Sequence, residues 1–261
     1  MDTATVPSQA ENAVPPRESA DRSRNDTATS PARVRALTPL SLCDWPGRSV
    51  SVLYLGGCNL RCPTCHNASL AFTPSLHPPL DTAPVLKALA ARKRWLDGVV
   101  VCGGEPTLDP GLPALVDALT GLGLPVKVDT NGMLPKVVAE VLRRAPDTTF
   151  AVDLKGPWGK YPSLTGGAVS PEEARSRLES VFALAAGRPG SFLFRITLVP
   201  EITPEDVGTA RRCLPAGFSL REQPYSNPVR NQTRSSGEQP GAPSATGAFP
   251  QSVPVAFPVP S

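Results

Sequence analysis

Three cysteines in the first quarter of the chain have the spacing of a metal-binding cluster. Cys58, Cys62 and Cys65 form a C-x3-C-x2-C pattern in a chain with six cysteines in all. In a reducing compartment, clustered cysteines more often bind metal than form disulfides. Three thiolates suit an iron–sulfur cluster that keeps one iron open to a small molecule. A zinc ion with His66 as its fourth ligand, or no metal, are the alternatives.

Further polar residues lie at the ends of predicted strands. Gly103-Gly104-Glu105-Pro106 follows the second strand, where two glycines let the backbone approach a ligand closely. A valine at Gly104 is therefore expected to block ligand binding by filling space that the backbone needs. Later strand ends carry Asp129, Asn131, Asp153 and Lys155, and Arg195 lies on the predicted strand over 192–198. Because the carboxyl ends of parallel strands form the active-site edge of α/β folds, we expect these side chains near the cysteines.

Six predicted strands alternate with five predicted helices. The strands are expected over residues 50–55, 98–102, 125–129, 150–154, 192–198 and 218–221, and the helices over 82–95, 112–122, 134–144, 171–186 and 204–212. Short, apolar, β-branched runs are typical of parallel strands buried on both faces. Residues 33–223 have room for about six βα units of roughly 30 residues. The predicted α/β fold is an incomplete (β/α)6 TIM-like barrel, with an open doubly wound sheet as the alternative.

The two ends of the chain differ in composition from this middle part. Proline accounts for 32 of the 261 residues, about 12% against a typical ~5%. Residues 1–32 show no helical or strand periodicity, and residues 224–261 are rich in proline, serine and glycine. We therefore predict disordered N- and C-terminal tails around one folded domain over residues 33–223.

Charge and hydropathy exclude several classes of function. The 26 Lys and Arg against 23 Asp and Glu leave a net charge of +3, too small to indicate binding to nucleic acid or to an anionic membrane. No run approaches the roughly 18 apolar residues of a membrane span, and no secretion signal opens the chain. These features predict a cytoplasmic protein.

The two motifs together resemble the radical S-adenosylmethionine (SAM) superfamily. C-x3-C-x2-C after the first strand and GGEP after the second are the signatures of that family. The resemblance implies that Cys58, Cys62 and Cys65 bind a 4Fe–4S cluster whose open iron is chelated by SAM. It further implies that the GGEP backbone contacts the methionine amino group of SAM. Reduction of the cluster would then split SAM into methionine and a 5′-deoxyadenosyl radical.

Finer matches resemble the single-cluster activating proteins of glycyl radical enzymes, especially those of anaerobic ribonucleoside-triphosphate reductase. The matches are the lead-in Leu42-Cys43-Asp44-Trp45-Pro46-Gly47, the sequence Cys65-His66-Asn67, DTNG at 129–132, DLK at 153–155, and Arg195. The resemblance implies a SAM site made by Gly103, Gly104, Glu105, Asp129, Asn131, Asp153, Lys155 and Arg195. Lys155 could pair with the SAM carboxylate, and Arg195 could hold a carboxylate or phosphate-like group.

The implied reaction is SAM cleavage followed by removal of hydrogen from a glycine Cα of a separate protein. The implied partners are a glycyl radical enzyme, in particular anaerobic ribonucleotide reductase, and a flavodoxin- or ferredoxin-like electron donor. Two alternatives stay open: a small-molecule synthase resembling the 7-carboxy-7-deazaguanine synthases, and a non-catalytic metal-binding relative. Thr64 departs from the family, which usually has an aromatic residue before the third cysteine, and the match is poor after Arg221.

Overall fold

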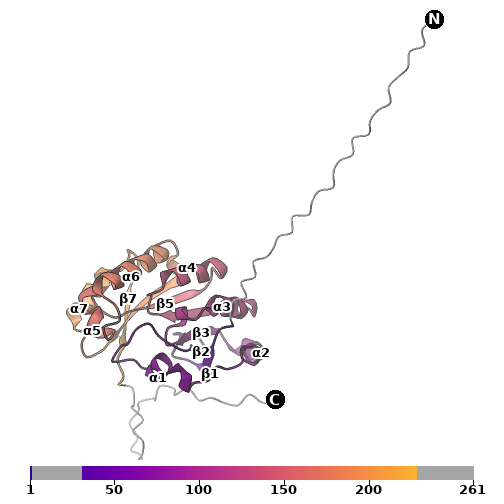
Figure 1. Ribbon diagram of the computed structural model, residues 1–261, viewed down its shortest axis with the longest axis horizontal. Coiled ribbons are helices and arrows are strands. Elements are labelled where there is room, and N and C mark those ends of the chain that lie inside the picture. Colours follow the sequence, from indigo (N-terminus) through magenta and orange to yellow (C-terminus); the bar gives the residue numbers. More distant parts are fainter. Residues whose placement is uncertain (2–30, 228–261) are drawn as a thin grey trace, which may run out of the picture.

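A seven-stranded sheet forms the centre of the molecule (Figure 1). The computed structural model describes Met1 and residues 31–227. Of the predicted tails at 1–32 and 224–261, residues 2–30 and 228–261 lie outside the described residues. The strands are β1 (Val34–Ser41), β2 (Val50–Leu55), β3 (Gly98–Gly103), β4 (Val126–Thr130), β5 (Thr149–Leu154), β6 (Phe192–Leu198) and β7 (Leu220–Pro224). β1 runs antiparallel to β2, and all the other neighbouring pairs are parallel.

The order of the strands distinguishes the two predicted folds. Strands β1 to β7 lie side by side in the same order as in the chain. A doubly wound sheet reverses its strand order at a switch point, whereas a barrel always winds in one direction. Among the described strands, β1 and β7 each have only one neighbour, so the sheet is open. The incomplete barrel is therefore confirmed, with six parallel strands and one additional antiparallel strand.

Both edge strands contain a proline, which explains the two differences from the prediction. β1 was not predicted, and its pairing with β2 becomes irregular between Thr38 and Ser41, on either side of Pro39. Pro224 was expected in the C-terminal tail but is the last residue of β7, opposite Leu198. Proline lacks the N–H that a central strand must donate, and it is tolerated at sheet edges.

The helices follow the predicted pattern closely. They are α1 (Ala68–Phe72), α2 (Thr82–Arg92), α3 (Leu112–Gly121), α4 (Pro135–Arg144), α5 (Tyr161–Leu164), α6 (Pro171–Ala186) and α7 (Pro204–Arg212), arranged around the sheet in Figure 1. The predicted helix over 82–95 changes to a 3₁₀ turn at Lys93–Trp95. The short helices α1 and α5 were not predicted. No helix in residues 31–227 has the length and apolar character that a membrane crossing requires.

The two faces of the sheet have different roles because side chains alternate along each strand. On β4, Val126 and Val128 belong to the main apolar core beneath the helices. Lys127 and Asp129 therefore point to the opposite, inner face of the sheet. Asp153 on β5 and Arg195 on β6 alternate in the same way with core residues. The inner face thus collects charged side chains from three neighbouring strands.

Candidate functional site

The three cysteines lie in the loop between β2 and α1, at the carboxyl end of the parallel sheet. The backbone N–H of Gly57 donates to Leu70 O at 2.8 Å, and the N–H of Arg61 donates to Thr165 O at 3.0 Å. These bonds tie the loop to α1 and to the turn after α5. Cys58 and Cys62 are half-buried and pack against the main core. The loop therefore presents its thiols from a fixed backbone.

The glycine pair after β3 allows close contact between backbones. The N–H of Gly104 donates to Leu55 O at 2.9 Å, and that of Glu105 donates to Gly57 O at 2.7 Å. A Cβ on Gly104 would lie 2.0 Å from Gly57 O, and one on Gly103 would lie 2.1 Å from Leu55 O. A side chain at Gly104 would therefore clash with the backbone. It would displace the cysteine loop itself, because Gly57 and not a ligand fills that space.

Glu105 joins the end of β3 to the end of β4. Its side chain is 1% exposed. One carboxylate oxygen accepts from Thr107 N, Thr107 Oγ1 and Thr130 Oγ1 at 3.1, 2.5 and 2.7 Å, and the other accepts from Asn131 N at 2.7 Å. Burial raises the pKa of Glu105, although these hydrogen bonds favour the carboxylate. Because protein donors contact both oxygens, the Glu105 side chain fixes Thr107, Thr130 and Asn131 relative to one another.

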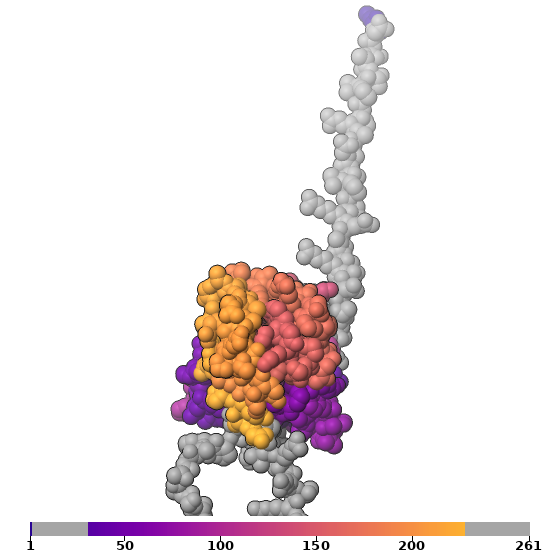
Figure 2. Space-filling model, turned by 90° about the vertical axis from the view of Figure 1, so that its left-hand side faces the viewer, coloured from indigo at the N-terminus to yellow at the C-terminus, as the bar shows by residue number. Residues whose placement is uncertain are grey.

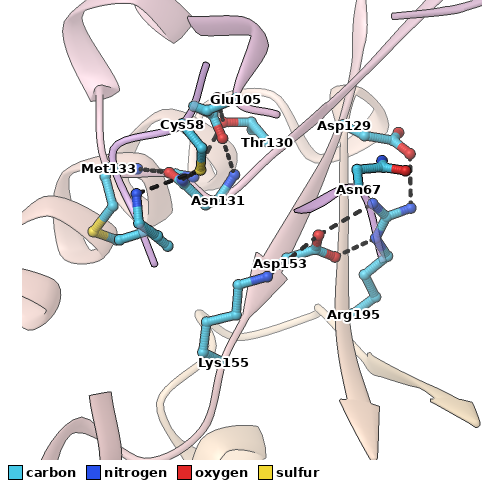
Figure 3. A network of polar contacts seen from close by, with 12 residues as sticks. Cys58, Asn67, Glu105, Asp129, Thr130, Asn131, Met133, Asp153, Lys155 and Arg195 are labelled. Atoms are coloured by element: carbon cyan, nitrogen blue, oxygen red, sulfur yellow. Dashed lines mark hydrogen bonds and ion pairs between the residues drawn. The ribbon is translucent and has the colours of Figure 1, made fainter. Parts of the chain in front are cut away.

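Asn131 connects the end of β4 with the cysteine loop (Figure 3). Its Oδ1 accepts from Met133 N at 2.9 Å, and its Nδ2 donates to Asn59 Oδ1 at 2.7 Å. The same Nδ2 lies 3.9 Å from Cys58 Sγ. The two motifs, which are more than 70 residues apart in the chain, are thus in direct contact. Thr130 and Asn59 were not identified as site residues from the sequence.

A row of alternating charges crosses the inner face of the sheet (Figure 3). Arg195 donates to Asp129 at 3.0 Å and forms a two-point ion pair with Asp153. Lys127 pairs with the other oxygen of Asp129, and Lys155 Nζ lies 3.7 Å from Asp153 Oδ2. We name these five residues the charge row. Three cations against two carboxylates leave it with one surplus positive charge.

The partners of Arg195 within the charge row are two carboxylates of the protein. Its guanidinium holds Asp129 and Asp153 in place and so orders the row. Burial alone would raise the pKa of Asp153, but Arg195 and Lys155 lower it below its ordinary value. Lys155 makes the longest ion pair of the row, and it remains the best placed cation for an anionic ligand.

Lys127 was not identified from the sequence, although a signal was present. It is a lysine between two core valines of β4, and its side chain is only 2% exposed. Strand alternation places it beside Asp129 on the inner face. Tyr161 was also missed, and its hydroxyl accepts from the backbone N–H of Lys155 at 3.2 Å. No local pattern indicated this contact, because α5 was not predicted.

Replacing Arg195 by leucine is expected to destabilise the protein by about 3–5 kcal/mol, the usual cost of breaking a buried ion pair. The change leaves Asp153 and one oxygen of Asp129 without their main counter-charge. Urea unfolding measures the free energy. The matched control is Arg143→Leu, which removes an exposed pair with Glu140 and should cost at most about 1 kcal/mol. Equal effects in both variants would contradict this role of Arg195.

The three thiols of the cysteine loop suit an iron–sulfur cluster that keeps one iron open. In such a cluster each thiolate binds a different iron, so the sulfurs need not meet at one ion. Among the described residues, no three His, Cys, Asp or Glu side chains converge on one ion position. Burial raises the pKa of Cys58 to about 11 and also raises that of Cys65, so metal loading must displace their protons.

The contacts of His66 are with Tyr225 and Ser226, which follow β7, and not with the three cysteines. Its Nε2 is 2.6 Å from Ser226 O, and its ring lies 5.3 Å from that of Tyr225. The zinc alternative, which needs His66 as a ligand, therefore has no support in this geometry. In Figure 2 the yellow C-terminal end of the described chain lies against the indigo and purple N-terminal part. This contact links the chain beyond β7 to the cysteine loop after β2.

A pocket of about 220 Å³ lies on the inner face beside the charge row. One wall is formed by Cys43, Asp44 and Pro46 of the loop between β1 and β2. The other walls come mainly from β4, β6 and β7, including Lys127, Arg195, Arg221 and Gln223. The pocket is therefore bounded by the loop after the first edge strand and by the last edge strand.

Comparisons with known proteins give a family and two relatives. A family model described as the radical SAM superfamily matches residues 52–214. A Methanocaldococcus jannaschii protein named "Putative glycyl-radical enzyme activating enzyme" is 28% identical over 176 residues, or 67% of this chain and 72% of that protein. The 7-carboxy-7-deazaguanine synthase of Hyperthermus butylicus is 32% identical over 162 residues, or 56% of this chain and 68% of that protein.

One solved structure shares the fold at low sequence identity. It is Streptococcus suis SuiB bound to its precursor peptide SuiA, with a TM-score of 0.50 and 21% identity. The match covers 70% of this chain and 41% of that one, so this chain spans about two fifths of the solved protein. The likeness concerns the fold and agrees with the open, mostly parallel sheet described above.

Proposed function

Because the chain belongs to the radical SAM superfamily, whose members use a 4Fe–4S cluster and SAM, we propose that it activates a glycyl radical enzyme. Cys58, Cys62 and Cys65 are the proposed cluster ligands. The observation that carries this proposal is the cysteine loop, which is held by the residues after β3 and β4 through Glu105 and Asn131. When bound and reduced, the cluster supplies the electron that splits SAM into methionine and a 5′-deoxyadenosyl radical.

The charge row offers one group for SAM. Lys155 is partly exposed, carries a positive charge and makes only a long contact with Asp153. We assign it to the carboxylate of SAM, through a charge-assisted hydrogen bond. Asp153 holds the ammonium group in place, and Arg195 in turn holds Asp153. Glu105 and Asn131 act on the other side of the site, where they orient the cysteine loop.

The open side of the sheet favours a protein substrate. A glycine Cα can reach SAM only if a loop of the partner enters the barrel, and β1 and β7 leave one side of the described sheet unpaired. The pocket of about 220 Å³ on the inner face is walled by residues of the lead-in motif and by β7. The M. jannaschii relative supports this reading by its name. Anaerobic ribonucleotide reductase is the proposed partner, with a flavodoxin- or ferredoxin-like electron donor.

A second candidate function is a small-molecule synthase. The 7-carboxy-7-deazaguanine synthase of H. butylicus is more identical to the chain than the M. jannaschii protein, although over a shorter stretch. The two candidates differ in where the radical ends, on a protein glycine or on a small product.

Anaerobic reconstitution followed by electron paramagnetic resonance distinguishes the candidates. With reductant and SAM, the mixture of this protein and an anaerobic ribonucleotide reductase should give the doublet of a glycyl radical, and neither protein alone should give it. Lys155→Ala should lower the yield of 5′-deoxyadenosine, because it removes the proposed partner of the SAM carboxylate. The activase proposal fails if no protein radical forms while a pterin-like substrate accelerates SAM cleavage.

A further inference from the structure

We propose that Asn131 is a positioning residue that donates a hydrogen bond to the sulfur of Cys58 and thereby raises the reduction potential of the cluster. This inference rests on the proposed function, because it requires Cys58 to be a cluster ligand. It adds a role that neither the motif match nor the comparisons assign. This role follows from the contacts that Asn131 makes with its neighbours.

The orientation of the Asn131 amide is determined by its neighbours. Oδ1 accepts from the backbone N–H of Met133 at 2.9 Å, and Nδ2 donates to Asn59 Oδ1 at 2.7 Å. A flipped amide would face the Met133 N–H with its own NH₂ group and Asn59 Oδ1 with an oxygen, so both contacts would be repulsive. The second N–H of Nδ2 is then available to Cys58 Sγ at 3.9 Å.

The backbone that carries this amide is equally well held. Asn131 is 6% exposed, and its N–H donates to the buried carboxylate of Glu105 at 2.7 Å. The next residue, Gly132, donates to Thr130 Oγ1 at 3.1 Å, and Thr130 also donates to Glu105. A rigid, buried donor costs little to order, so its contact with sulfur is present before any cluster is bound.

Cys58 differs from Cys62 and Cys65 in having the side-chain N–H of Asn131 beside its sulfur. Among the described residues, the side-chain N–H of Asn131 approaches Cys58 Sγ, whereas the hydrogen bond to Cys65 comes from the backbone of Asn67. The backbone N–H of Leu60 also points to Cys58 Sγ, at 3.4 Å. Two donors therefore converge on Cys58 Sγ. Of these, the Asn131 side chain is the donor that a substitution can remove without changing the backbone.

The direction of the effect follows from electrostatics. Reduction adds negative charge to the cluster and its thiolates, and an N–H dipole directed at a sulfur stabilises the reduced state more than the oxidised one. Hydrogen bonds to the sulfurs are among the factors that set the potentials of these clusters. The effect is enlarged in a buried site, where screening by water is weak. Removing the donor should therefore make the cluster harder to reduce.

The test is a redox titration of the reconstituted protein without SAM. Asn131→Ala should shift the midpoint potential to a more negative value at unchanged iron content. The matched control is Asn67→Ala, because Asn67 also uses its amide within this loop but donates to Gly103 O at 2.9 Å and not to a cysteine. Its potential should equal that of the unmodified protein. An unchanged potential in Asn131→Ala, or an equal shift in both variants, overturns the proposal.

A second variant covers the case in which Asn131→Ala does not load iron. Asn131→Asp keeps the side-chain shape and the oxygen that accepts from Met133, but it has no N–H for the sulfur. Its potential should also fall, and an unchanged value overturns the proposal. Cys58→Ser separates this result from the function itself. If that variant keeps full iron content, the cluster assignment fails, and the role of Asn131 fails with it; loss of iron together with an unshifted Asn131 variant removes only the role of Asn131.

Discussion

Serine at Cys58, Cys62 or Cys65 is expected to abolish the iron–sulfur absorption of the reconstituted protein. Iron binding in such clusters requires thiolates, and a serine hydroxyl stays protonated under conditions in which a thiol ionises. With three proposed ligands there is no fourth cysteine in the motif to replace a lost one. Each single change should therefore reduce the iron content to the background level. Absorbance in the visible range and a colorimetric iron assay measure the effect.

The matched control is serine at Cys213. Its thiol contacts Thr209 O at the end of α7, at 3.4 Å, and belongs to a different part of the fold. Cys213→Ser and Cys43→Ser should retain the full absorption. Cluster loss in Cys213→Ser together with an intact cluster in Cys62→Ser would show that the ligand set is wrong.

Alanine at Gly104 is expected to prevent assembly of the site. Its Cβ would lie 2.0 Å from Gly57 O and 3.2 Å from Ala71 Cα, and both are backbone atoms that no side-chain rotation can move away. Overpacking a rigid site costs about 1–3 kcal/mol and occasionally more, and contact with backbone puts this case at the upper end. Relief of the clash requires the cysteine loop to move, so iron content and stability to urea should fall together.

Gly159→Ala is the matched control for this substitution. A Cβ at Gly159 has no atom within 4 Å, and the residue lies in the 3₁₀ turn before α5 with no left-handed backbone angle. Its free energy of unfolding should change by no more than about 0.5 kcal/mol. A Gly104→Ala protein with normal stability and iron content would mean that the cysteine loop can shift without loss, contrary to the contacts described here.

Much of the fold could be predicted from local patterns. Five of the six predicted strands agree closely with the structure, because runs such as those at 50–55 and 98–102 are mostly apolar and rich in valine. Chain length alone favoured an incomplete barrel over a complete one, since six βα units fit between residues 33 and 223. β1 could not be predicted, because Pro39 interrupts its pattern and only its edge position makes the proline acceptable.

The candidate site was predicted by residue type but not by role. Motif spacing brought Cys58, Glu105 and Asn131 to strand ends, and the structure places them in contact. The motif match did not show what the Glu105 side chain contacts, and the structure shows that its carboxylate accepts four hydrogen bonds from the protein. The glycine pair was expected to admit a ligand, yet it admits the backbone of β2 and the cysteine loop.

There is a physical reason why the sequence predicts the strands and helices but not the contacts between distant side chains. Strand and helix periodicity depends on neighbours within a few residues, so the sequence by itself determined the elements and the edge of the sheet at which polar groups gather. Which donor meets which acceptor depends on register between strands that are far apart in the chain. Arg195 pairs with Asp129 across 66 residues and with Asp153 across 42. Only the tertiary structure could decide that Arg195 pairs with both carboxylates, whereas Lys155 makes the longest ion pair of the row.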